Sequence, residues 1–85
     1  MAKVTIYSSD YCPYCSRAKA LLQARGVTDV EEIVVDGKPD VRARMTQITG
    51  RTSVPQIFVG DTHVGGCDDL HALDGRGGLL PLLQA

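Results

Sequence analysis

The hydrophobic pattern changes abruptly at YCPYC, residues 11–15, and this change constrains the fold more than any other feature of the sequence. Residues 3–8 before it alternate apolar and polar side chains and include β-branched residues, which predicts a strand. After it, apolar side chains recur at helical spacing as far as Gly26, and Pro13 suits the first turn of a helix. The two cysteines of the stretch therefore lie where a strand ends and a helix begins.

The rest of the chain alternates between the same two kinds of pattern. Runs of β-branched residues predict strands, while prolines at the start and glycines at the end mark helices. These signals predict a strand over 30–37, a helix over 39–50, a hairpin over 55–66 with its turn at Gly60-Asp61, and a helix over 67–78. The apolar tail at 79–83 is expected to pack on the core, and Pro81 limits any helix there.

The predicted order of elements is β-α-β-α-β-β-α, within a single domain that spans residues 1–85. Strands joined through a helix lie parallel and near one another with right-handed crossovers, whereas a hairpin adds antiparallel strands. The sequence therefore predicts an α/β protein with a four-stranded mixed sheet covered by helices, which is the layout of a thioredoxin-like fold.

Composition and charge narrow the class of partner. The chain is 44% hydrophobic and 22% charged, as is usual for a globular protein, and its net charge is −1 with no basic block. A nucleic-acid partner is therefore not expected. The apolar runs are far shorter than the roughly 20 residues that span a membrane, and the N-terminus lacks the apolar core of a secretory signal. We expect a cytoplasmic monomer without a membrane partner.

The chain has three cysteines, at positions 12, 15 and 67, and in a reducing compartment a CxxC pair is more often catalytic or metal-binding than structural. Cys12 lies at a predicted helix N-terminus, where free N–H groups and the helix dipole favour a thiolate. Cys15 follows one turn later, within reach of a disulfide. This position favours redox chemistry, with an exposed Cys12 and a more buried Cys15.

Two other uses of the cysteines are left open by the residues. A zinc site would need four ligands, and Cys12, Cys15, Cys67 and one of the two histidines supply that number without a recognised spacing. A structural disulfide or a pair of inert cysteines is the second alternative. His63 and His71 are expected to be surface residues rather than ligands.

Three segments of the sequence resemble motifs of the glutaredoxin family: CPYC at 12–15, TSVPQIFV at 52–59 and GGCDDL at 65–70. Together with the order of elements, the resemblance covers nearly the whole chain. The chain has no Trp, whereas thioredoxins usually carry one before a Gly-Pro pair between their cysteines. The resemblance implies a glutathione-dependent thiol–disulfide oxidoreductase that uses glutathione as co-substrate and holds no cofactor tightly.

The resemblance also implies roles for the two cysteines of CPYC. Cys12 is the nucleophile, which becomes glutathionylated and is released by a second glutathione. Cys15 is the resolving cysteine, which closes the 12–15 bond when a protein disulfide is reduced. The implied partners are glutathionylated or disulfide-containing proteins, with ribonucleotide reductase as a candidate of the family. An alternative function within the family is a two-iron cluster held between two subunits by the first cysteine and glutathione, although Pro13 argues against it.

A glutathione site is implied in the same way. A cis bond between Val54 and Pro55 leaves the Val54 backbone free to pair with glutathione, and the N–H groups of Cys67 and Asp68 meet its γ-glutamyl carboxylate. Helix capping by Asp68 or Asp69 is an alternative that can hold together with the site role, and a place in the core is the alternative for Tyr14, for which the resemblance favours the site. Cys67 is not expected to be catalytic. The glutathione-binding residues implied by the resemblance are Tyr14, Ser53, Val54, Pro55, Cys67, Asp68 and Asp69.

One position departs from the family pattern. Many glutaredoxins carry a lysine shortly before the first cysteine, where this chain has Ser9 and the acidic Asp10. Without this lysine, the helix N-terminus is expected to provide more of the stabilisation of the Cys12 thiolate. Arg51 or Arg42 is the candidate for the glycine carboxylate of glutathione.

Overall fold

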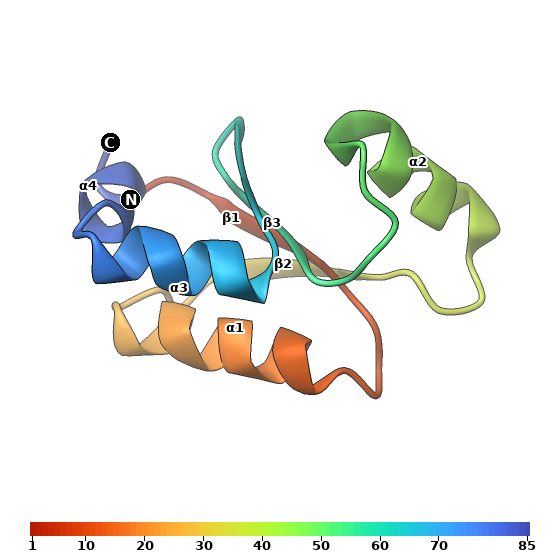
Figure 1. Ribbon diagram of the computed structural model, residues 1–85, viewed down its shortest axis with the longest axis horizontal. Coiled ribbons are helices and arrows are strands. Elements are labelled where there is room, and N and C mark those ends of the chain that lie inside the picture. The colour runs from red at the N-terminus through yellow and green to blue at the C-terminus, as the bar shows by residue number, and fades with distance from the viewer.

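A four-stranded mixed sheet with the strand order β2-β1-β3-β4 organises the protein. The computed structural model describes residues 1–85 (Figure 1). Strand β1 runs parallel to β2 and antiparallel to β3, and β3 and β4 form the hairpin. The elements are β1 Val4–Ser8, α1 Pro13–Ala24, β2 Val30–Val34, α2 Pro39–Thr49, β3 Gln56–Val59, β4 Thr62–Gly65, α3 Cys67–Gly75 and α4 Leu79–Leu83. The predicted thioredoxin-like fold is confirmed.

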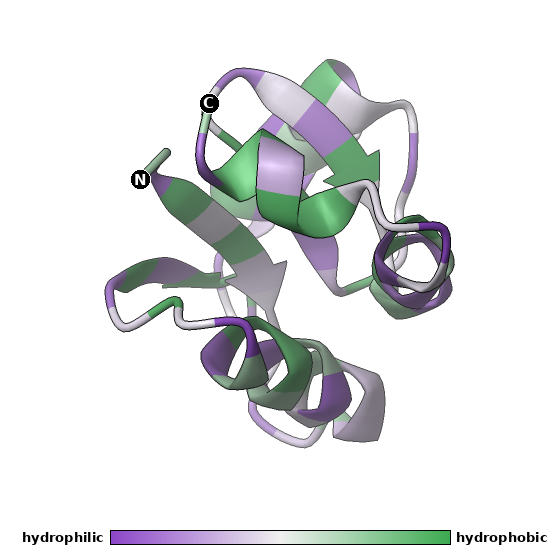
Figure 2. Ribbon diagram, turned by 90° about the vertical axis from the view of Figure 1, so that its left-hand side faces the viewer, coloured by the Kyte–Doolittle hydropathy of each residue, from purple (hydrophilic) through white to green (hydrophobic).

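The helices lie on both sides of the sheet. Figure 1 shows α1 and α3 side by side on one side and α2 on the other. In Figure 2 the helical ribbons carry both green and purple segments, as expected of helices that bury one side and expose the other. None of the helices combines the length and the apolar character needed to cross a bilayer.

The main core lies between the sheet and the α1–α3 layer. Alternate residues of β1 and β3 point into it, because successive side chains of a strand face opposite sides of a sheet. Met45 of α2 is also fully buried but lies outside this cluster, under the second layer. The buried cluster consists of Val4, Ile6, Ala18, Leu22, Val27, Ile57, Val59, Cys67, Leu70, Leu79 and Leu83.

The C-terminal segment differs from the expected tail. Residues Leu79–Leu83 form the short helix α4, with Pro81 in its first turn. Proline is tolerated there because the N–H groups of a first turn have no partner within the helix. Leu79 and Leu83 are fully buried, and the Leu83 carbonyl accepts a hydrogen bond from the N–H of Ala2 at 2.7 Å. The segment does pack on the core, and it also holds the N-terminus.

The end of α1 is tied to α3 by charge. Arg25 is the C-cap residue of α1 and donates two hydrogen bonds of 2.7 Å to Asp74. This paired guanidinium lowers the pKa of the Asp74 carboxyl. Since α1 carries the CPYC segment and α3 begins at Cys67, the ion pair helps to fix the two helices that frame the site described below.

Replacing Leu22 with Ala should lower the free energy of unfolding by about 2–5 kcal/mol, because the side chain is fully buried between α1 and the sheet. Urea unfolding followed by circular dichroism measures the change. Leu80→Ala is the matched control: Leu80 is 43% exposed on α4, so its loss should cost no more than about 1 kcal/mol. Equal losses in the two variants would contradict this placement of the core.

Candidate active site

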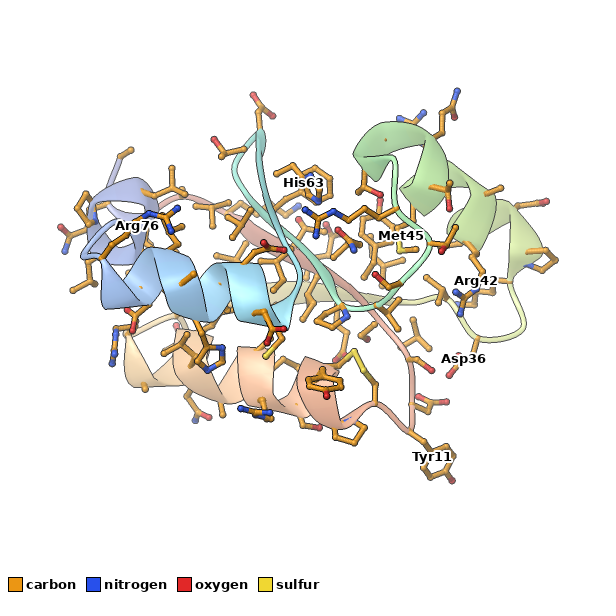
Figure 3. The ribbon with its side chains drawn as sticks, viewed as in Figure 1. Tyr11, Asp36, Arg42, Met45, His63 and Arg76 are labelled. Atoms are coloured by element: carbon orange, nitrogen blue, oxygen red, sulfur yellow. A yellow bond between two sulfur atoms is a disulfide. The ribbon has the colours of Figure 1, made fainter.

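The sulfur of Cys12 caps the N-terminus of α1. Its Sγ accepts a hydrogen bond from the Cys15 N–H at 3.1 Å, and its carbonyl accepts one from the Ser16 N–H. Cys12 and Cys15 are joined as a disulfide, with their Cα atoms 5.2 Å apart (Figure 3). Cys15 is 1% exposed, whereas Cys12 is only partly buried. The predicted difference in access between the two sulfurs is confirmed.

The loop before Cys12 is held by Asp36, which follows β2. The Asp36 carboxylate accepts hydrogen bonds from the Asp10 N–H at 2.8 Å and from the Ser9 hydroxyl at 2.7 Å. These two bonds, the backbone one first, lower the pKa of Asp36. Ser9, at the place of the family lysine, therefore serves to anchor the loop. Tyr11 next to it is 99% exposed and points into solvent (Figure 3).

A groove of about 220 Å³ lies beside the disulfide. One wall is the start of α1, another is the loop before β3, and the third is the start of α3. Cys12 Sγ lies 3.9 Å from the carbonyl oxygen of Val54, which places the disulfide beside this groove. The lining residues are Tyr14, Arg51, Ser53, Val54, Pro55, Gly66, Cys67, Asp68 and Asp69. All seven residues that the family resemblance implied for glutathione are among them.

The backbone around Val54 is open to the groove. The Val54-Pro55 peptide bond is cis, as the resemblance implied. The N–H of Val54 makes no hydrogen bond within the protein. Tyr14 is 54% exposed on the opposite wall, so the core alternative for this residue is wrong.

Asp69 holds two walls of the groove together. Its carboxylate accepts the Gly66 N–H at 2.9 Å and the Arg51 Nη1 at 2.7 Å. These donors, Gly66 first, lower the pKa of Asp69. Gly65 has φ +118°, and a side chain there would collide with the Asp69 carboxylate. The helix-capping interpretation holds for Asp69, whereas the exposed Asp68 carboxylate has no hydrogen-bond partner in the protein.

Cys67, the first residue of α3, is one of the groove-lining residues. The residue is 4% exposed, and this burial raises the pKa of its thiol. Its Sγ and its carbonyl oxygen lie 3.5 and 2.9 Å from Nδ1 of His71. A buried thiol with a raised pKa is a poor nucleophile.

The two histidines differ in solvent exposure. His71 is exposed, as expected of a surface residue, but His63 is half-buried and hydrogen-bonded to Gln56 at 2.7 Å. Burial and the nearby charge of Arg51 lower the pKa of His63. No group of three or more His, Cys, Asp or Glu side chains is placed to hold a metal ion, so the four-ligand zinc alternative is not assembled.

Two lining residues were not among those implied by the resemblance. Gly66 was detectable as the first residue of a Gly-x-x-Asp pattern, which is a helix N-terminus signal. Arg51 was only a candidate, and the structure places it in the groove. Arg42 instead donates to the Thr52 carbonyl at 3.1 Å and is not part of the lining.

A disulfide at the start of the helix that follows β1, facing a cis-proline loop, defines a thiol–disulfide oxidoreductase of the thioredoxin-like class. The model of the glutaredoxin family matches residues 4–64. The chain belongs to the glutaredoxin family.

Relatives agree with this assignment along the whole chain. The chain is 58% identical to a glutaredoxin of Pseudomonas aeruginosa over 100% of both proteins. It is 56% identical to glutaredoxin 3 of Escherichia coli, over 99% of this chain and 100% of that protein. The structure matches that of a buckwheat glutaredoxin–glutathione complex with a TM-score of 0.88 and 35% identity, over 98% of this chain and 77% of that one. The protein is a dithiol glutaredoxin, a glutathione-dependent disulfide reductase.

Asp69 should make stability depend on pH below about 4. Its folded pKa lies below the ordinary value of about 3.9, so its contribution is fully present above that value and is lost as the pH falls through the folded pKa. Asp69→Asn should therefore be less stable than the parent at pH 7, and the gap should shrink on acidification. Urea unfolding between pH 7 and pH 3 measures it.

The control for this experiment is Asp61→Asn, which removes an exposed carboxylate at the hairpin turn. Its stability should follow that of the parent at every pH. A gap between Asp69→Asn and the parent that stays constant from pH 7 to pH 3 would contradict the role given to the carboxylate.

Proposed function

We propose that Cys12 is the nucleophile, that Cys15 is the resolving cysteine, and that the groove beside them binds the glutathionyl part of the substrate. The observation that carries the proposal is the convergence of residues from three separated segments on one groove beside the disulfide. The substrates are glutathionylated proteins and proteins with a disulfide. In this proposal the chain works as a single-domain monomer in the cytoplasm.

Each end of glutathione has a matching group in the groove. The N–H groups of Cys67 and Asp68 at the start of α3 suit the γ-glutamyl carboxylate, and the unpaired Asp68 carboxylate suits the neighbouring ammonium. The Val54 backbone pairs with the central residue as a short extra strand would. Arg51 meets the glycine carboxylate with the N–H groups that its contact with Asp69 leaves free.

The one-cysteine route follows from this placement. The Cys12 thiolate attacks the glutathione sulfur of a glutathionylated protein, and the protein leaves as a thiolate. A second glutathione thiolate then attacks the sulfur of glutathione on Cys12, which forms oxidised glutathione and regenerates the Cys12 thiolate. Two glutathione sulfurs are joined and one mixed disulfide is reduced, so the electrons balance. The Cys15 N–H, which donates to Cys12 Sγ, stabilises the attacking thiolate.

The two-cysteine route uses the same first attack on a protein disulfide. Cys12 forms a mixed disulfide with the protein, and Cys15 attacks the Cys12 sulfur to release the reduced protein and close the 12–15 bond. Two glutathione molecules then reduce that bond. Burial keeps Cys15 from external disulfides, while its place one turn after Cys12 keeps it within reach of the mixed disulfide.

Cys12→Ser should abolish turnover, because a serine hydroxyl cannot attack a disulfide and so cannot take part in thiol–disulfide exchange. Cys15→Ser should keep the reduction of a glutathionylated peptide and lose most of the reduction of a protein disulfide. A coupled assay with glutathione, glutathione reductase and NADPH measures both substrates. Turnover by Cys12→Ser, or equal losses of both substrates in Cys15→Ser, would overturn the assigned roles.

Asp68→Asn should raise the KM for a glutathionylated peptide by about tenfold and change kcat little, because the negative charge that pairs with the ammonium of the bound substrate is removed. Asp61→Asn is the matched control, because Asp61 is exposed at the hairpin turn and is not among the groove-lining residues; this variant should keep the KM of the parent. An unchanged KM in Asp68→Asn would remove Asp68 from the proposed site.

A further inference from the structure

The fully buried Gln56, the first residue of β3, connects the groove to the hairpin. Its Nε2 lies 3.0 Å from the carbonyl oxygen of Ser53 and 3.4 Å from the Ser53 hydroxyl. Its Oε1 lies 2.7 Å from Nε2 of His63 on β4. The chain of contacts thus runs from the hairpin to the groove wall.

The chemistry of the end groups fixes the direction of each hydrogen bond. The Ser53 carbonyl can only accept, so the amide nitrogen of Gln56 must face it. The amide oxygen of Gln56 then faces His63 and can only accept, so Nε2 of His63 carries a proton. Both the imidazolium and one neutral tautomer of histidine meet this need.

The orientation of Ser53 decides that of Val54. The peptide unit between them is planar and trans, so the Ser53 C=O and the Val54 N–H point in opposite directions. Gln56 holds the Ser53 carbonyl toward the buried interior. The Val54 N–H is therefore directed away from the interior, and it has no partner in the protein.

We propose that His63 is a positioning residue, which acts through Gln56 to hold the Ser53–Val54 peptide in the orientation that presents the Val54 N–H to the glutathionyl substrate. The proposal rests on the proposed binding of glutathione in the groove. His63 itself is not part of the groove lining. Figure 3 shows it on the hairpin, where its ring packs on Phe58 with centroids 5.0 Å apart.

The donor of His63 matters because Gln56 is buried. Without it, the amide oxygen of Gln56 is left as a buried acceptor with no partner, which is costly. Rotation of the amide to relieve this cost releases the Ser53 carbonyl. The substitution therefore weakens substrate binding in the groove, although His63 itself lies outside the groove.

The test compares two variants. His63→Phe keeps a planar ring on Phe58 but has no donor, whereas His63→Gln offers an amide N–H to Gln56. We expect the KM for a glutathionylated peptide to rise by about five- to tenfold in His63→Phe, with kcat nearly unchanged. His63→Gln should return the KM to within about twofold of the parent. Thr62→Ala, on the same strand and exposed, is the control and should match the parent.

Two further readouts separate the possible causes. In the reduced protein, the rate of Cys12 alkylation by iodoacetamide should be nearly the same in all variants, because the reoriented peptide is the one between Ser53 and Val54, whereas Cys12 Sγ lies near the carbonyl on the other side of Val54. The amide NMR signal of Val54 in the free protein should shift in His63→Phe and stay near its parent position in His63→Gln.

Some outcomes would overturn the proposal. These are a parent-like KM in His63→Phe, a KM raised equally in both His63 variants, and a Val54 signal that does not respond to the loss of the donor. Failure of the proposed function is distinguishable, because the parent protein would then show no turnover of the glutathionylated peptide. In that case the Val54 signal in the free protein still decides whether His63 holds the peptide.

Discussion

The hydrogen bond from the Cys15 N–H to the sulfur of Cys12 is the contact on which the rest of the site depends. The start of a helix has N–H groups without partners, and here a cysteine sulfur takes the place that an aspartate or serine oxygen usually fills. The same contact begins α1, favours negative charge on Cys12 and leaves Cys15 one turn further on, inside the protein. A fold element and a reactive group are therefore specified by one interaction.

The groove is completed by the N-terminus of α3 and by the loop before β3, which pack against the N-terminus of α1. Asp69 joins them, because its carboxylate accepts from Gly66 at the beginning of α3 and from Arg51 ahead of the loop. Gln56 supports the loop from the buried side, through the Ser53 carbonyl. Polar groups are thus hydrogen-bonded on the inner side of the groove, while the Asp68 carboxylate and the Val54 N–H have no partner in the protein.

Most elements of the fold were predictable because their signals are local. Proline and glycine mark the ends of α2, and the change of period at Pro13 marks the start of α1. The short helix α4 is missing from the predicted order because Pro81 was taken to disfavour a helix. Proline breaks a helix interior, but Pro81 lies in the first turn of α4, where proline is tolerated. His63 was assigned to the surface because it follows the hairpin turn in the sequence, whereas its contact with Gln56 on the neighbouring strand is visible only in the folded hairpin.

The sequence by itself determined the CPYC pair at a strand-to-helix junction and, through resemblance, seven residues that line one groove. Local periodicity and family motifs carry that information without long-range contacts. The tertiary structure alone decided which charges pair across the fold, such as Arg25 with Asp74 and Arg51 with Asp69. It also decided that Asp68 stays free while Asp69 is engaged, because adjacent residues of a helix point in different directions and meet different neighbours.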